Sequence, residues 1–532
     1  MRFAWILLLP LACLWAQPRA VESAALTGFN AIRSEDLRTY LTYLSSDALQ
    51  GRETSYPGER LAAKYIADHF HTFGLTPAGD SGSFLQHFEV DVVHENAGSN
   101  IVLESTTGRQ SFYWGQDFMS LALRDTVLKG PIAFVGYHDN QVPEGERGKL
   151  AGRIVVSFIG TRSGAQDTSL AGSQKKFASY TRREPGALAV LNILDDAGAT
   201  SYLRVIGRFN PNEARMVLSG EGIRRTAQPT VTYAISPALG GAIAAHCGKS
   251  LAQLRIEAAS DSIFSPILLD DVSLTISSST VREHRQTENV AGLLEGSDPV
   301  MKKDVVVFSA HFDHLGVGPR GEIYHGADDD GSGTAMVMEL AHAFATNPVR
   351  PRSSLLFLTV SGEEKGLLGS AYYTGHPFIP LEQTVADFNT DMIGRIDPAH
   401  EPASASVYTY LIGSDKISTQ LDSILQVANR ESNNIQFDYT YNSELDPNRF
   451  YRRSDHFNFA RHGVPIAFFF TGVHADYHQP TDTVDKILFA RMVTIGQVIY
   501  YSGWKTANLT HMLEKNGTGS GYTDPPPQQT VR

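Results

Sequence analysis

The second half of the chain alternates between short apolar runs and longer amphipathic stretches. The apolar runs are Val305–Phe308, Leu355–Val360, Val385–Phe388 and Ile466–Phe470. Runs of this length between polar residues predict strands that are buried on both faces. The amphipathic stretches predict helices over Ser332–Ala345, Ile417–Glu431 and Val484–Trp504. Strand and helix in alternation predict an α/β fold, with a mostly parallel (mixed) sheet that has helices on both faces.

Two helices are also predicted near the N-terminus. The first begins with Ser34 as its N-cap, and the second runs from about Gly58 to Gly74. Their apolar stripes are Leu37, Leu41 and Leu44 in the first helix, and Leu61, Tyr65, His69 and Phe73 in the second. A strand at Asn100–Glu104 follows them.

A chain of 532 residues is too long for one hydrophobic core, so two domains are expected. Between about Gly130 and Thr280, short strands mix with Ala/Gly-rich stretches, which indicates a separate β-rich inserted domain. The predicted organisation is a signal peptide at 1–20, a discontinuous domain formed by 29–118 and 281–505, an inserted domain at 119–280, and a disordered tail at 506–532.

Composition and charge restrict the location and the partners of the protein. The net charge of −12 without a basic block argues against nucleic acid or an anionic membrane as a partner. Residues 1–20 have one early Arg, an apolar stretch and then small residues, the pattern of a secretory signal peptide, and no later segment is apolar enough to span a membrane. Cys13 lies in this segment, and lipid attachment there is the alternative that we keep open, although Pro10 fits that pattern poorly. Cys247 then has no intrachain partner. Export without disulfides is typical of a bacterial periplasmic or secreted protein.

Five side chains that can bind metal follow the predicted strands or lie just beyond them. They are His311 in SAHFDHLG, Asp329 in HGADDDGSG, Glu364 in SGEEKG, Asp391 in FNTDMIGR and His478 in ADYHQPTD. Carboxyl ends of parallel strands meet at one edge of a sheet, where ligands collect. Two imidazoles and three carboxylates suit zinc better than magnesium or calcium. Five ligands exceed what one catalytic zinc needs, so the sequence predicts two metals that share a carboxylate.

Three further residues are candidates for catalysis. Glu363 precedes Glu364 in a turn, and if Glu364 binds metal, Glu363 can act as the general base on water. Asp313 can hold an imidazole by a hydrogen bond, as carboxylates behind metal ligands do. The hydroxyl of Tyr477, next to His478, can donate to an oxyanion.

Taken in order, these motifs closely resemble those of the di-zinc exopeptidase family of secreted bacterial leucyl aminopeptidases, which also contains glutamate carboxypeptidase. The resemblance covers roughly Ser34–Glu104 and Asn289–Trp504. It implies a zinc-exopeptidase fold and two Zn²⁺ ions per chain. His311 and Asp391 would bind one zinc, Glu364 and His478 the other, and Asp329 would bridge them, with a cis bond to Asp330 as in relatives. The resemblance also implies that Glu363 is the general base on a water that bridges the zinc ions, that Asp313 orients His311, and that Tyr477 is the oxyanion donor. The mixture of short strands and Ala/Gly-rich stretches in the inserted segment is similar to that of a protease-associated domain.

The expected activity is removal of N-terminal residues from peptides. A carboxypeptidase or dipeptidase of the same family is the first alternative, because Arg449, Arg452 and Arg453 could grip a carboxylate. A single-zinc glutaminyl cyclase or a non-catalytic receptor-like module are the others. Retention of both His311 and Asp391 argues against the cyclase, and retention of every ligand and of the base argues against the receptor.

Overall fold

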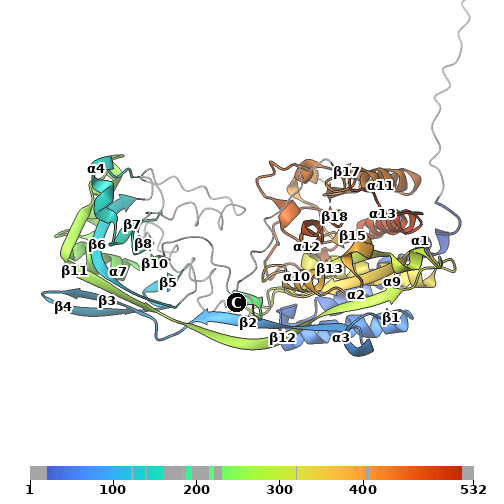
Figure 1. Ribbon diagram of the computed structural model, residues 1–532, viewed down its shortest axis with the longest axis horizontal. Helices are drawn as coiled ribbons and strands as arrows, with labels where there is room; N and C mark the ends of the chain where they lie inside the picture. Colours follow the sequence, from blue (N-terminus) through green and yellow to red (C-terminus); the bar gives the residue numbers. More distant parts are fainter. Residues whose placement is uncertain are drawn as a thin grey trace, which may run out of the picture. The chain divides into compact units, whose positions relative to one another are not determined.

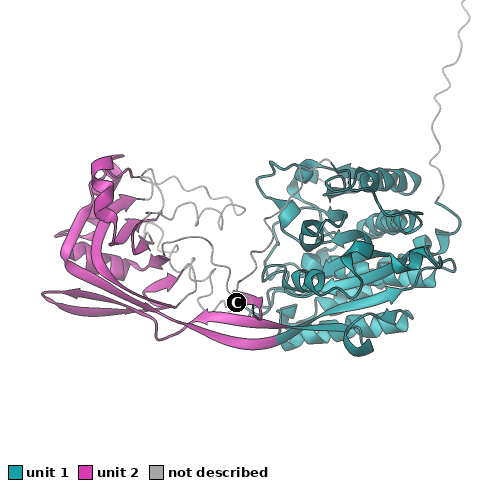
Figure 2. Cartoon of the chain, viewed as in Figure 1, with its two compact units in different colours: residues 1–88, 286–532 teal, residues 89–285 magenta. Residues whose placement is uncertain are grey.

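The chain divides into two units, which are coloured separately in Figure 2, and the sequence of one interrupts the sequence of the other. The computed structural model describes residues 21–120, 125–137, 140–159, 162, 184, 186–194, 215–220, 231–318, 320–401 and 406–517. Unit 1 comprises residues 1–88 and 286–532, and unit 2 comprises residues 89–285. The predicted signal peptide lies outside the described residues.

Unit 1 is built on a mixed sheet with the strand order β17-β16-β18-β15-β13-β14-β12, and β1 pairs with β12. The strands are β1 (Thr76–Pro77), β12 (Thr280–Leu294), β13 (Val305–His311), β14 (Ser354–Val360), β15 (Thr384–Thr390), β16 (Tyr408–Ile412), β17 (Gln436–Asp438) and β18 (Ile466–Phe470). Strand β13 runs parallel to β14 and β15, and β15 runs parallel to β18. Strands β12 and β16 are antiparallel to their neighbours β14 and β18. The predicted α/β fold with a mostly parallel, mixed sheet is confirmed.

Helices cover both faces of this sheet (Figure 1). They are α1 (Leu26–Ala31), α2 (Ser34–Leu44), α3 (Pro57–Thr72), α9 (Gly333–Thr346), α10 (Leu368–Gly375), α11 (Thr419–Glu431), α12 (His456–Arg461) and α13 (Phe489–Ala507). Successive side chains of a strand point to opposite faces, so β13 contributes side chains to two hydrophobic cores, one on each face of the sheet. Val306 and Phe308 pack with residues of α9 and α13, whereas Val305 and Val307 pack with Tyr373 of α10 and with α12. Burial on both faces explains why the strand runs are almost wholly apolar.

The N-terminal helices differ in detail from the prediction. Helix α2 begins at Ser34, but no side chain caps it. Its Arg33 amide donates instead to Glu339 Oε1, at 2.8 Å. In α3 the buried face is one position away from the predicted stripe, because Ala62, Ile66 and Phe70 are fully buried while Leu61 is 45% exposed.

Unit 2 contains a second sheet, with the strand order β4-β3-β11-β6-β7-β8-β10-β5. Its elements are β3 (Asn100–Ser105), β4 (Gly108–Tyr113), β5 (Phe118–Ser120), β6 (Thr126–Tyr137), α4 (Glu144–Arg147), β7 (Ile154–Phe158), β8 (Ala189–Ile193), β10 (Val231–Ile235), α7 (Pro237–His246), α8 (Leu251–Ser260) and β11 (Ile267–Ser278). Strand β2 (Leu85–Glu95) lies beside β12 and pairs with β9 (Arg215–Leu218). Residues 100–120 pair within this second sheet, so they belong to unit 2, although the sequence placed residues up to 118 in the first domain. The likeness to a protease-associated domain stays a prediction.

The part of the chain that packs in unit 1 extends further toward the C-terminus than the sequence predicts. Helix α13 runs to Ala507, and Leu513 is 5% exposed in the core of unit 1. The predicted tail at 506–532 therefore begins too early, and its residues 518–532 lie outside the described part. No described helix has the length and apolar character needed to cross a membrane.

Candidate functional site

The predicted ligands come together at the carboxyl ends of the central strands. His311 is the last residue of β13, Glu364 lies four residues after β14, and Asp391 directly follows β15. Asp329 lies in the turn that leads into α9, and His478 lies in the loop after β18. Since β13, β14, β15 and β18 are parallel, their ends meet at one edge of the sheet.

Asp329 presents a different carboxylate oxygen to each histidine. His311 Nε2 lies 3.4 Å from Asp329 Oδ1 and 3.8 Å from Asp391 Oδ1. His478 Nε2 lies 3.0 Å from Asp329 Oδ2 and 3.2 Å from Glu364 Oε2. The five residues thus form two histidine–carboxylate groups that share Asp329, and the bond between Asp329 and Asp330 is cis.

Several buried polar atoms at this site have no hydrogen-bond partner among the described residues. They include His311 Nε2, Asp329 Oδ2 and Glu364 Oε1, whose close contacts with neighbouring imidazoles or carboxylates do not have the angles of hydrogen bonds. Burying polar atoms without hydrogen bonds costs folding free energy. Several such atoms close together therefore indicate a ligand, such as a metal ion, that they bind jointly. Mixed nitrogen and oxygen ligands fit zinc.

His314 also belongs to this group, which the sequence did not reveal. It is fully buried, and its Nδ1 lies 2.8 Å from Glu364 Oε1. One oxygen of Glu364 therefore faces His314, while the other faces His478. The repeated histidine in HFDH was the available signal, since His311 and His314 lie in one motif.

The two adjacent glutamates have opposite electrostatic environments. Burial raises the pKa of Glu363 well above its ordinary value, with Glu364 and Asp391 adding to the effect and His311 opposing it. Burial, the largest single effect, acts to raise the pKa of Glu364, but His478 and His314 together outweigh it and hold that pKa below its ordinary value. Paired carboxyls whose pKa values are pushed apart suit different roles, a proton carrier and a charged ligand.

Asp313 supports both the histidine and the glutamate. Its Oδ1 accepts a hydrogen bond from the Glu363 amide at 3.1 Å, and its Oδ2 accepts one from Thr54 Oγ1 at 2.8 Å. The nearest approach to His311 Nδ1 is the Asp313 backbone carbonyl at 3.2 Å, with the carboxylate at 3.6 Å. Asp313 thus fixes the turn that carries Glu363 as well as the ring of His311.

Arg52 is a residue of the site that sequence reasoning missed. It is fully buried and, within the described part of the chain, donates only to backbone carbonyls: those of Phe312 at 2.7 Å, His325 at 2.8 Å, Gly326 at 2.9 Å and Leu44. Phe312 follows His311, and Gly326 precedes Asp329 by three residues. Arg52 therefore ties together the backbone on either side of the two ligands, although a single Arg in GRET gave no local sign of burial.

A pocket opens beside the cluster. Its lining residues are Asp329, Glu363, Asp391, Met392, Phe450, Arg453, Phe468, Phe470, Val473 and Tyr477. The Tyr477 ring stacks on His478 at 3.9 Å, and its hydroxyl accepts a hydrogen bond from Arg453 Nη2 at 3.2 Å. Burial raises the pKa of Tyr477 well above its ordinary value, and Asp329 and Glu364 add to this, so the hydroxyl keeps its proton and can donate it in a hydrogen bond.

The arginine cluster of the sequence is divided by the structure. Arg453 lines this pocket, whereas Arg449 and Arg452 line a second one with Glu444 and Asp446. Arg395 is held in an ion pair with Asp476, at 3.0 Å.

The fold is an α/β unit of the zinc-exopeptidase type, and the candidate ligands lie together at one edge of its sheet. Residues 289–502 match the model of peptidase family M28, and this match confirms the predicted resemblance. Aminopeptidase YwaD of Bacillus subtilis (strain 168) is 26% identical over 223 residues, which are 41% of this chain and 44% of the relative. A probable leucine aminopeptidase 2 of Aspergillus oryzae is 29% identical over 204 residues, 38% of this chain and 37% of the relative. The chain thus spans less than half the length of these two relatives.

The fold extends further than the sequence matches. The solved structure of an aminopeptidase from Aneurinibacillus sp. strain AM-1 aligns with 92% of this chain and 97% of its own, at a TM-score of 0.52 and 18% identity. This likeness supports the fold of the chain.

Proposed function

We propose that this chain is a di-zinc aminopeptidase. The observation that carries the proposal is the shared Asp329, which offers one oxygen to each of two histidine–carboxylate groups. His311 and Asp391 would hold one zinc ion, and Glu364 and His478 would hold the other. The M28 match and the relatives, both named aminopeptidases, support the same reaction class.

The chain's own residues divide the work of hydrolysis. Bound zinc would act as a Lewis acid that polarises the scissile carbonyl and lowers the pKa of water. Glu363 takes a proton from the attacking water and passes it to the leaving amine, a role that its raised pKa suits. Tyr477 donates a hydrogen bond to the carbonyl oxygen as negative charge develops there. Thr54, through Asp313 and the Glu363 amide, keeps the base in place.

Charge in the pocket favours a free amino terminus as the group that is recognised. Glu363 lines the pocket and is not assigned to a zinc ion, so its carboxylate can accept a hydrogen bond from an ammonium. Met392, Phe450, Phe468, Phe470 and Val473 supply an apolar wall, which suits an apolar first side chain.

A carboxypeptidase is the second candidate, and Arg453 is the observation that favours it. Arg453 is the one cation among the described residues that line the pocket, and a guanidinium can bind a carboxylate through two hydrogen bonds. However, its guanidinium already packs over Phe450, 4.9 Å from the ring centre, and donates to Tyr477. We therefore place the aminopeptidase first.

A substrate pair that differs only at the amino terminus tests the direction of cleavage. We expect the purified chain to hydrolyse a leucyl dipeptide and to leave its N-acetylated form almost intact. Rapid hydrolysis of the acetylated dipeptide would establish the carboxypeptidase instead, and Arg453→Gln should then abolish it.

The number of zinc ions at the site is tested by removing the shared ligand. Asp329→Asn should lower the zinc content by about two ions per chain, because both metals lose a ligand. Loss of a single ion, measured by elemental analysis against the unaltered chain, would disprove the shared site.

A further inference from the structure

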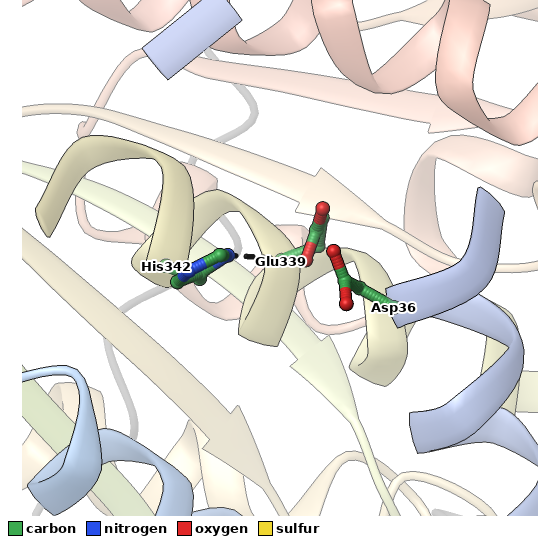
Figure 3. A group of neighbouring side chains, drawn as sticks. All are labelled: Asp36, Glu339 and His342. Carbon is green, nitrogen blue, oxygen red and sulfur yellow. Dashed lines mark ion pairs between the residues drawn. The ribbon is translucent and has the colours of Figure 1, made fainter. Parts of the chain in front are cut away.

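Three metal-ligand side chains also converge between α2 and α9, outside the site described above (Figure 3). Asp36 comes from the first turns of α2, and Glu339 and His342 come from α9. Residues three apart in a helix lie on the same face, so Glu339 and His342 are side by side. One potential ligand atom from each of the three residues lies within 4.8 Å of those from the other two.

Glu339 brings a buried carboxylate oxygen without a hydrogen-bond partner into this group. Its side chain is 0% exposed. Glu339 Oε1 accepts the hydrogen bond from the Arg33 amide, but Oε2 has no partner among the described residues. His342 Nδ1 is likewise buried and without a hydrogen bond in the described part of the chain. A carboxylate oxygen is costly to bury unpaired, so Oε2 and Nδ1 point to a ligand that takes both.

The separation of these two atoms is that of two ligands on one metal ion. Glu339 Oε2 and His342 Nδ1 lie 3.7 Å apart, beyond the 2.7–3.2 Å of a hydrogen bond. Two atoms each about 2.0–2.2 Å from a tetrahedral zinc lie roughly 3.3–3.6 Å apart. The ligand pairs at the catalytic cluster have the same spacing, from 3.0 Å for His478 and Asp329 to 3.8 Å for His311 and Asp391.

Asp36 can supply the third ligand without giving up its ion pair. Arg33 contacts Asp36 through Nε and Nη2, and both contacts are with Oδ2, at 2.9 Å. Among the described residues, no hydrogen bond to Asp36 Oδ1 occurs. With a neutral imidazole, Arg33, Asp36 and Glu339 leave one net negative charge, which a cation would neutralise.

We propose that Asp36, Glu339 and His342 bind a divalent transition-metal ion, zinc foremost, which joins α2 to α9. One imidazole and two carboxylates favour zinc over magnesium and calcium. The side chains of Asp36 and His342 are 25% and 27% exposed, so solvent can reach the site and water can complete the coordination. The metal would connect the N-terminal segment to the helix that follows the shared ligand Asp329.

Zinc titration of the full chain tests this site. The chain is dialysed against increasing buffered free Zn²⁺, and bound zinc is counted by elemental analysis. His342→Gln and Glu339→Gln should each bind about one ion fewer than the unaltered chain, or bind it with an affinity weakened by roughly 10-fold to 100-fold or more, because changes even to partners of metal ligands have effects of that size. His71→Gln, which alters an exposed histidine of α3, is the matched control and should bind as the unaltered chain does.

The outcome separates this proposal from the proposed function. Asp329→Asn should lose about two ions and keep the one at α2 and α9, whereas His342→Gln should show the reverse and keep peptide hydrolysis. Zn²⁺ should also raise the melting temperature of Asp329→Asn, and the added change His342→Gln should abolish that increase. Equal zinc binding by the unaltered chain and His342→Gln throughout the titration would overturn the proposal, and the group would then be an ion pair between Glu339 and a protonated His342. If Glu339→Gln does not fold, the comparison with His342→Gln still decides, because His342 is partly exposed.

Discussion

Replacing Arg52 by lysine should destabilise unit 1 and weaken zinc binding at the same time. Arg52 uses four N–H groups on four backbone carbonyls, and no acidic side chain is among its hydrogen-bond partners in the described residues. A lysine keeps the charge but offers three N–H groups from one nitrogen, which cannot span the positions that the guanidinium fork reaches. We expect two of the four carbonyls to lose their donor.

The size of the effect follows from those two bonds. A hydrogen bond to a charged group contributes about 1.5–3 kcal/mol, so the loss of two such bonds in Arg52→Lys should lower the free energy of unfolding by about 3–6 kcal/mol. For a large domain this corresponds to a fall in melting temperature of roughly 6–12 °C, at about 2 °C per kcal/mol. The freed carbonyls of Phe312 and Gly326 lie beside the loops of His311 and Asp329, so zinc affinity should fall by roughly 10-fold or more.

Thermal unfolding monitored by circular dichroism, with and without a chelator, measures the first effect, and competition with a zinc dye measures the second. Arg60→Lys is the control, because Arg60 is exposed and makes a single long contact of 3.4 Å with the Gln286 carbonyl. Its melting temperature should stay within about 1 °C of the unaltered chain, as for most surface changes. If Arg52→Lys had the same melting temperature and zinc affinity as Arg60→Lys, Arg52 would not hold the loops of His311 and Asp329 in place.

Four further predictions concern the proposed base, the glutamate next to it, the proposed oxyanion donor and a buried carboxyl. Glu363→Gln should lower kcat by about 10²–10⁴-fold with zinc content unchanged, since the amide cannot carry a proton; normal turnover would remove Glu363 as the base. Glu364→Gln should instead lower the zinc content, measured by elemental analysis. Full retention of zinc would exclude Glu364 as a ligand. Tyr477→Phe should lower kcat by roughly 10²–10³-fold with little change in KM, and steady-state kinetics with an unchanged kcat would exclude the hydroxyl from the mechanism. Burial raises the pKa of Glu59 to about 8 from 4.5, so its contribution to stability is complete below about pH 4.5 and is lost as the pH rises toward 8. Between roughly pH 5 and pH 8, the melting temperature of Glu59→Gln should therefore fall less than that of the unaltered chain. An equal fall in both proteins would contradict the raised pKa.

Local patterns were sufficient to predict the sheet of unit 1 and the edge where the ligands meet. Apolar runs such as Ile466–Phe470 have few alternatives to a buried strand, and β18 has those bounds. Once the strands are parallel, residues at their carboxyl ends must lie near one another. This is why His311 and Asp391 could be placed together from the sequence, 80 positions apart.

Burial of polar side chains depends on distant parts of the chain and was not predictable. Arg52 and Glu59 are fully buried because the segment before α3 and the first turn of α3 pack on loops and strand ends more than 200 residues later. The allocation of residues 100–120 to unit 2 rests on pairing between β3 and β11, which no local alternation encodes. Leu61 is a second example. The amphipathic pattern predicted helix α3, but the face that the structure buries is shifted by one residue, so Leu61 is exposed.

Because the sequence of unit 2 interrupts that of unit 1, the order in which the two units fold matters. Closing an unstructured loop of the 197 residues in unit 2 would cost about 5 kcal/mol of chain entropy, by the logarithmic dependence on length. Strands β2 and β12, through which the chain enters and leaves unit 2, are neighbours in the sheet. A unit 2 that folds first would hold these two strands together and remove most of that entropy. The N-terminal residues that support the ligands, Arg52 and Thr54 among them, would then reach their places only after the inserted unit has formed.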